Sequence, residues 1–283
     1  MKLWRGLACM LATAGMLGCS LFVDLSGLSG GANDESDGGD SGASDSASDA
    51  PVTIDGGSDS GCAGSGGPAQ LRAGGVCIDT TEVTNDQYAA FLAASVPTSS
   101  QPSYCSWNDS FEPTTWPTSP SIADFPVVNI DWCDAYAFCA WAGKRLCGAI
   151  SGGPLDTSSL GNAATDQWYS ACSAGGALVY PYGTSYSATA CNSPIDDAGP
   201  TPGVVAVTAD PACVGSAPGL FDMTGNADEW VDSCDGTTGS SDNCTRRGGS
   251  CDDPSGDQQT CAFSRTSSRS MTDTDIGIRC CGK

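Results

Sequence analysis

The segment from Arg246 to Cys261 reads RRGGSCDDPSGDQQTC and holds two cysteines among carboxylates and arginines. A cysteine thiolate is a nucleophile and a soft metal ligand, so this segment could serve as a reactive thiol site. The same cysteines could instead belong to a disulfide framework. The neighbouring aspartates disfavour a thiolate at Cys251, whereas the two arginines favour one, and the sequence leaves open which pair is closer.

The chain has 17 cysteines and no histidine. The lack of histidine excludes Ser-His-Asp and Cys-His catalysis, and it excludes histidine-ligated zinc or iron. In an exported chain, so many cysteines are typical of disulfides rather than of thiolate metal sites. Cys9 and Cys19 fall within or next to the expected leader, which leaves an odd number. We therefore expect one free thiol, or one cysteine paired with another chain.

The N-terminus resembles the signal peptide of a bacterial lipoprotein. Residues 1–18 combine basic residues with an apolar run too short to span a bilayer, and Leu17-Gly18-Cys19 resembles a lipobox. We expect a lipidated Cys19 at the start of the mature chain and, with Ser20 following, an anchor in the outer membrane of the cell envelope. The alternative is an ordinary secretory signal. Either way, the protein leaves the cytoplasm.

The composition changes sharply along the chain. Residues 19–60 are rich in Gly, Ser and Asp and contain no Lys or Arg, which predicts a disordered acidic tether. Residues 61–283 are long enough for one domain with a sizeable core. The net charge of −22 would repel phosphates, so nucleic acid is not expected as a partner and cations are better candidates.

Two segments of the domain carry the periodicity and caps of helices. In CIDTTEVTNDQYAAFLAAS, Thr84 and Gln87 form a capping box before a helical pattern. In VVNIDWCDAYAFCAWAGKRL, Asp131 suits the N-cap and Gly143 suits the C-terminal end. A third, shorter helix is expected at about residues 166–172.

The chain beyond the third helix is dominated by Gly, Pro, Asp and Ser. It contains only short strand-like runs, such as VVAV at residues 204–207. Helices followed by irregular, cysteine-rich chain predict a loop-rich α+β domain with small sheets, stapled by disulfides.

Several blocks of the domain resemble, in the same order, the formylglycine-generating enzyme family, also called the sulfatase-modifying factor family. They are IDTTEVTNDQYAAFL, PVVNIDWCDAYAFCAWAGKRL, WYSAC, YPYG, GLFDMTGNADEW, RRGGS and GIRC. They cover about Cys77 to Cys280. The resemblance implies a C-type-lectin-like fold with little regular secondary structure. One departure follows the second helix, where this chain has a longer, glycine-rich connection that holds the extra Cys147.

The resemblance implies two long-range disulfides, Cys139–Cys280 and Cys172–Cys261. Proximity along the chain suggests further pairs, although connectivity cannot be deduced from sequence. These short-range candidates are Cys62–Cys77, Cys105–Cys133, Cys191–Cys213 and Cys234–Cys244. Three cysteines remain, Cys147, Cys251 and Cys281, of which two can pair and one would be free.

In the catalytic members of the family, two thiolates spaced C-x4-C hold a copper ion, and a substrate cysteine is oxidised to formylglycine by oxygen. Counted forward from RGGS, the two positions fall on Asp253 and Gln258. Counted back from Cys261, they fall on Cys251 and Gly256. Neither count supplies a second thiol, and oxygen ligands suit Cu(I) poorly. We therefore do not expect copper, and Cys251 is left as the candidate catalytic residue.

The resemblance also implies a calcium site in the block GLFDMTGNADEW. Calcium takes six to eight hard oxygens from carboxylates and carbonyls. The alternative is a tight turn that needs no metal. The expected calcium ligands are the side chain of Asp222, the carbonyls of Gly225 and Ala227, and the carboxylate of Glu229, with Asn192 and the carbonyl of Ser193 at a second site.

These features leave two functions open. The first is a non-catalytic binding or scaffold domain for an unknown protein or glycan ligand, held at the membrane by a lipid anchor. The second is an enzyme of the exported compartment, either a divergent formylglycine-generating oxidoreductase that acts on exported proteins or another oxidase that uses Cys251. The missing thiol pair and the long tether favour the first, while the family blocks alone support the second. Fold does not settle function.

Overall fold

The computed structural model describes residues 61–117, 119, 122–194 and 203–283. The expected signal peptide, the lipidation site at Cys19 and the acidic tether lie outside these residues. In the part of the chain that is described, no helix is long and apolar enough to cross a membrane.

The described chain folds into short helices and short strands joined by long loops. The helices are α1 (Asn85–Ala93), α2 (Trp132–Trp141) and α3 (Gln167–Cys172), with 3-10 turns η1 (Thr98–Ser100), η2 (Ser103–Cys105), η4 (Thr157–Ser159) and η5 (Gly256–Gln259). The strands are β1 (Gln70–Ala73), β2 (Val76–Asp79), β3 (Arg145–Leu146), β4 (Asp228–Cys234), β5 (Asn243–Arg247), β6 (Ser264–Ser268), β7 (Ile276–Ile278) and β8 (Cys280–Cys281). The loop-rich α+β architecture predicted from the sequence is confirmed.

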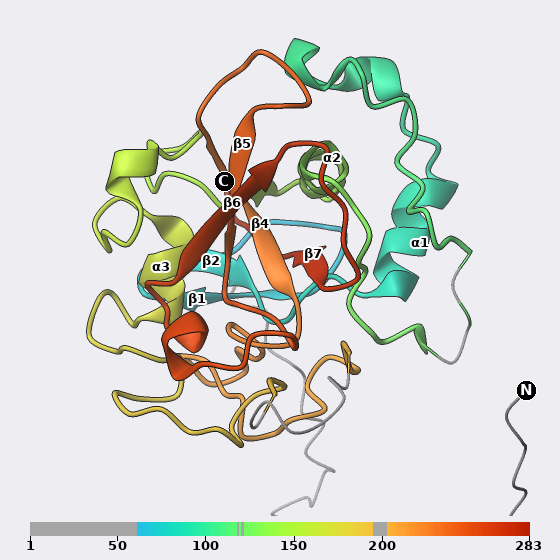
Figure 1. Ribbon diagram of the computed structural model, residues 1–283. Coiled ribbons are helices and arrows are strands. Elements are labelled where there is room, and N and C mark those ends of the chain that lie inside the picture. The colour runs from blue at the N-terminus through green and yellow to red at the C-terminus, as the bar shows by residue number, and fades with distance from the viewer. Residues whose placement is uncertain (1–60, 118, 120–121, 195–202) are drawn as a thin grey trace, which may run out of the picture. The chain divides into compact units, whose positions relative to one another are not determined.

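The strands form two four-stranded sheets. The first has the order β1-β2-β8-β3, and all its pairs are antiparallel. The second has the order β6-β5-β4-β7, in which β7 pairs with β4 in parallel. Figure 1 shows β4, β5 and β6 crossing the front of the view, with α3 on one side of them and α1 on the other. Residues next to β7 and β8 therefore connect the two sheets.

The helices begin at the residues that the sequence predicts. The Oγ1 atom of Thr84 accepts from the backbone N–H of Gln87, and the Gln87 side chain accepts from the N–H of Thr84, which completes the capping box of α1. Asp131 caps α2 in the same reciprocal way with Asp134. Gly143 follows α2 with a φ of 74°, a left-handed conformation that favours glycine at a helix end.

The main core lies where α1 and α2 pack against the second sheet. Tyr88 on α1 stacks on Phe138 of α2 with ring centroids 5.5 Å apart. Trp132 and Trp230 are fully buried, and the indole N–H of Trp230 donates to the carbonyl of Ile130 at 3.1 Å. Burying one such side chain contributes about 3 kcal/mol, so these rings fix α2 against β4.

Seven disulfides staple the described residues. They include both long-range pairs that the resemblance implies, and Cys147 pairs with Cys281. Among the described cysteines, Cys251 alone is free. The other four pairs are those expected from proximity, Cys62–Cys77, Cys105–Cys133, Cys191–Cys213 and Cys234–Cys244.

The interpretation of residues 204–207 as strand-like is wrong, because they form no strand. The backbone N–H of Val205 donates to Oδ1 of Asn226 at 2.9 Å, and Nδ2 of Asn226 donates to the Val205 carbonyl at 3.3 Å. One side-chain amide thus satisfies both backbone groups that a neighbouring strand would otherwise pair.

Candidate functional site

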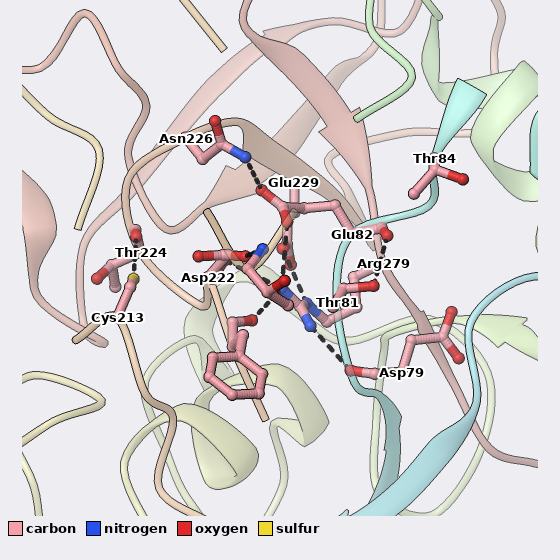
Figure 2. Close-up of polar contacts among 12 residues, drawn as sticks. Asp79, Thr81, Glu82, Thr84, Cys213, Asp222, Thr224, Asn226, Glu229 and Arg279 are labelled. Atoms are coloured by element: carbon pink, nitrogen blue, oxygen red, sulfur yellow. Dashed lines mark hydrogen bonds and ion pairs between the residues drawn. The ribbon is translucent and has the colours of Figure 1, made fainter. Parts of the chain in front are cut away.

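A fully buried arginine, Arg279, lies at the centre of the charged groups around the predicted calcium loop (Figure 2). Its Nε donates to Oε1 of Glu229 at 2.9 Å, and its Nη2 lies 4.0 Å from Oε2 of Glu82. One guanidinium therefore contacts two buried carboxylates. It also donates at 2.8 to 3.0 Å to three backbone carbonyls, those of Asp79, Phe221 and Asp222.

Segments that are far apart in the sequence position this cluster. Glu82 lies between β2 and α1, Glu229 belongs to β4, and Arg279 lies between β7 and β8. The turn before β4 has left-handed backbone at Asp222 (φ 55°) and Asn226 (φ 58°). Asn226 then directs its Nδ2 to Oε1 of Glu82 at 3.0 Å, as Figure 2 shows. The turn is thereby fixed to the chain that leads into α1.

Burial dominates the electrostatics of the three carboxyl groups. It raises the pKa of Glu82 well above its ordinary value, and the charge of Asp222 raises it further. Burial raises the pKa of Asp222 to about 6 and also raises that of Glu229, against the opposing effect of Arg279. Because three carboxyl groups share one guanidinium, their mutual repulsion and burial both favour the protonated form.

The thiol of Cys251 lies among carboxylates. Burial raises its pKa to about 12, and the charges of Asp252, Asp275 and Asp253 contribute in that order. The side chain is 1% exposed. A thiol with so high a pKa stays protonated at neutral pH, so it is neither a good nucleophile nor a ready metal ligand.

The two arginines of the RRGGS block point to other partners. Nη1 of Arg246 donates to Oδ2 of Asp228 at 3.1 Å. Nη2 of Arg247 donates to the carbonyl of Cys261 at 3.1 Å, and its guanidinium lies 5.1 Å from the ring centroid of Trp168. The sequence left open whether the arginines or the aspartates lie closer to Cys251. The structure places the carboxylates beside it and directs the arginines elsewhere.

A polar network fixes the chain on either side of Cys251. The Oγ of Ser250 donates to Oδ2 of Asp275 at 2.7 Å, and the Ser250 N–H donates to Oδ2 of Asp253 at 2.8 Å. Arg265 forms ion pairs with Asp253 and with Asp228. Arg265 therefore offsets part of the negative charge of this region, whereas Asp252 and Asp275 form no ion pair with a described residue.

Comparison with known proteins identifies the family of this domain. Residues 42–283 match the sequence profile of the sulfatase-modifying factor enzyme 1-like domain. The chain belongs to this family. No curated protein sequence matches it.

Three solved structures are similar to this chain at low identity. CarF aligns with a TM-score of 0.50 and 20% identity, over 78% of this chain and 96% of CarF. PvdO from Pseudomonas aeruginosa aligns with a TM-score of 0.47 and 20% identity, over 74% and 80% of the two chains. Treponema denticola variable protein 1 aligns with a TM-score of 0.44 and 19% identity, over 73% and 84%. At such identities, the likeness to CarF establishes the fold alone.

The residues of this sulfatase-modifying factor domain do not fit the two-thiolate copper site of the catalytic members. Cys261 is bonded to Cys172, so it cannot act as a thiolate. Cys251 is the free thiol of the described residues, and the second position of each count is Gln258 or Gly256. One buried thiol with amide and carboxylate neighbours is a poor donor set for Cu(I).

Glu229 does not fit the calcium role that the sulfatase-modifying factor family implies for it. Its Oε1 accepts from Arg279, and its Oε2 accepts from the indole N–H of Trp168 at 2.6 Å. Oδ2 of Asp222 accepts from the backbone N–H of Thr208 at 2.7 Å. A cation bound by Glu229 would have to share these oxygens with Arg279 and Trp168. Arg279 supplies positive charge to this cluster and holds the start of the loop through the carbonyls of Phe221 and Asp222. A calcium role for Asp222, Gly225, Ala227 and Glu229 stays a prediction.

The second expected calcium set is adjacent to the first. Asn192 donates through Nδ2 to the carbonyl of Gly203 at 2.9 Å and to Oδ1 of Asn226 at 3.1 Å. Its carbonyl accepts from the Asn226 N–H at 2.8 Å. Asn192 therefore joins the loop of the first set to the chain after residue 202, and Ser193 is buried beside it. A calcium role for Asn192 and Ser193 stays a prediction.

Glu82, Trp168 and Arg279 were not expected at this site. Each lies far along the chain from Glu229, so no local spacing links them. The one available signal is that they fall within or next to blocks shared with the sulfatase-modifying factor family, IDTTEVT, WYSAC and GIRC.

Proposed function

We propose that this sulfatase-modifying factor domain is a non-catalytic binding module. The observation that carries the proposal is the state of Cys251, which is buried and free while its neighbours Cys172 and Cys261 are paired. Copper-dependent oxidation in the family requires two thiolates at this position. The other described cysteines all form disulfides, which leaves no second thiol for this chemistry and supports a binding role instead.

We further propose that a lipid at Cys19 and the tether of residues 19–60 hold the module at the cell envelope. The lipobox-like Leu17-Gly18-Cys19 and the acidic Gly/Ser/Asp composition support this arrangement. The wild-type protein is expected in detergent-extracted membrane fractions, and Cys19→Ala is expected in the soluble fraction. Equal partitioning of the two proteins would contradict the anchor.

A Cu(I) titration against a competing chelator tests the non-catalytic assignment. We expect no stoichiometric, chelator-resistant binding, because one protonated thiol with a pKa of about 12 cannot replace two thiolates.

In the same preparation, an alkylating reagent is expected to label Cys251 only after unfolding, since the residue is 1% exposed. Cys251→Ser, which keeps the size of the side chain, is expected to fold normally.

The opposite outcome is specific. If wild type binds one equivalent of Cu(I), Cys251→Ser loses it, and a cysteine-containing peptide gains an aldehyde, the proposal fails. The alternative then holds, a divergent formylglycine-generating oxidoreductase that acts on exported proteins.

A further inference from the structure

A pocket of about 230 Å³ opens at the end of the second sheet, away from the residues of the Arg279 cluster. Its walls come from η2, the start of α2, the loop before η4, the end of β4 and the chain that follows β6. The volume is below that of an ordinary small-molecule site, so the pocket suits a group of side-chain size. The lining residues used below are Tyr104, Trp132, Pro154, Asp232, Asp235 and Arg269.

The arginine in the wall of this pocket is already neutralised. The guanidinium of Arg269 lies 4.4 Å from the ring centroid of Tyr104 and 4.5 Å from that of Trp132. Its Nη2 forms an ion pair with Asp242 at 3.1 Å and donates to the carbonyl of Gly236 at 2.8 Å. Asp242 therefore offsets the charge of Arg269 through Nη2, while Nη1 has no hydrogen-bond partner among the described residues. The two rings add apolar wall to the pocket.

Two aspartates line the pocket, and their carboxylates differ. Both oxygens of the exposed Asp235 accept hydrogen bonds from Asn243, at 2.8 Å from its backbone N–H and at 2.7 Å from its side-chain amide. No described residue donates a hydrogen bond to the half-buried Asp232 carboxylate, and Arg145 and Arg269 act on it only at longer range. Because its oxygens are not enclosed by protein donors, this carboxylate is free to accept hydrogen bonds from a ligand that enters the pocket.

We propose that this pocket binds an alkylammonium group, with the ammonium on Asp232 and the carbon chain against Tyr104, Trp132 and Pro154. An ammonium group offers three donors to a carboxylate that accepts none from the described residues and has positive charge only at longer range. The chain's net charge of −22 attracts such ligands over longer distances. The same group can come from a lysine side chain of a protein or from a free amine. The inference rests on the proposed binding role, for which it names a ligand class.

Titration of the full chain with n-butylammonium and with a short lysine-containing peptide tests the site, followed by the NMR signals of the Trp132 and Tyr104 rings. We expect saturable shifts for both probes and none for the peptide with an acetylated lysine. Tighter binding of the peptide identifies a protein lysine as the source, and equal binding identifies the amine itself. Asp232→Asn is expected to weaken binding at least about tenfold, because a charge-assisted hydrogen bond is lost.

Asp235→Asn is the matched control. It removes the same formal charge from the same rim, yet that carboxylate is already bonded to Asn243, so binding is expected to change less than about twofold. Equal losses in the two variants would indicate general charge attraction and overturn the site. Unchanged binding in Asp232→Asn would overturn it as well. Near-ultraviolet circular dichroism identifies any variant that has not folded.

The pH dependence gives a second readout. Burial raises the pKa of Asp232 to about 6, against Arg145 and Arg269, so binding is expected to weaken as the pH falls from 7.5 to 5 and the carboxylate gains a proton. An affinity independent of pH over this range would contradict a role for Asp232. A failed amine titration leaves the copper result intact, so this inference and the proposed function fail separately.

Other charged and titratable groups around Asp232 also bear on its pH dependence. They are Arg145 on β3, Arg269 after β6, Tyr104 in η2, Tyr136 on α2 and Asp235 after β4.

Discussion

Arg279→Ala is expected to lower the free energy of unfolding by about 3 to 5 kcal/mol, or to prevent folding, because it leaves buried charge without its partner. Glu229 loses its ion pair, Glu82 loses the nearest positive charge, and three carbonyls lose a donor. Urea unfolding followed by tryptophan fluorescence, with the disulfides intact, measures the change. Arg279→Lys keeps the positive charge but not the planar guanidinium with its several N–H donors, so an intermediate loss of unfolding free energy is expected.

Two comparisons make this prediction specific. Lys283→Ala removes an exposed positive charge at the C-terminal end of the same segment and is expected to change stability by less than about 0.5 kcal/mol. A calcium chelator is expected to leave the melting temperature unchanged, since Arg279 neutralises Glu229. A bound calcium held at a hundred times its dissociation constant would contribute about 2.7 kcal/mol. A clear drop on chelation, with calcium found by elemental analysis, would contradict the role given to Arg279.

Removing both Cys139–Cys280 and Cys147–Cys281 is expected to cost more than the sum of the two single removals. The two bridges span 141 and 134 residues and end on adjacent cysteines, so they close nearly the same loop. While one remains, the other constrains only a loop of roughly ten residues. The chain-entropy model then gives about 3 kcal/mol for either pair and about 8 kcal/mol for both.

Paired cysteine-to-alanine variants, unfolded in urea under non-reducing conditions, provide the measurement. Cys62–Cys77 spans 15 residues and shares no loop with these bridges, so its removal is expected to add about 3 kcal/mol in any background. If the losses for the two long bridges were simply additive, the shared-loop account would be wrong.

The helix starts were predictable from the sequence because their determinants are local. Thr84 and Gln87 lie three residues apart, and Asp131 lies directly before its helix, so the residue types alone encode the caps. Short-range disulfides were predictable for a similar reason, since neighbouring cysteines meet easily. The long-range pair Cys139–Cys280 needed the family resemblance, because no local feature connects its members.

The charged cluster was not predictable, because its members meet only through the fold. Glu82 and Arg279 come together when β7 pairs with β4 and β8 pairs with β2. The role of Asn226 was not predictable either. Its side-chain amide pairs with the backbone of Val205 as a strand would, and a single side chain leaves no periodic pattern in the sequence. The direction of Arg246 and Arg247 likewise depends on Asp228 and Trp168, which lie elsewhere in the sequence.

The position of β8 has a consequence for the order in which the first sheet can assemble. β8 is the last element of the described chain, yet it lies inside its sheet, between β2 and β3. While the chain is synthesised from its N-terminus, β2 and β3 each keep an unpaired edge until residues 280 and 281 are present. The disulfides of Cys139 in α2 and of Cys147 just after β3 also cannot form before these residues are present. The first sheet therefore cannot be completed stepwise, and a chain that stops before this point exposes unpaired strand edges and reduced thiols, which are prone to aggregation and mispairing.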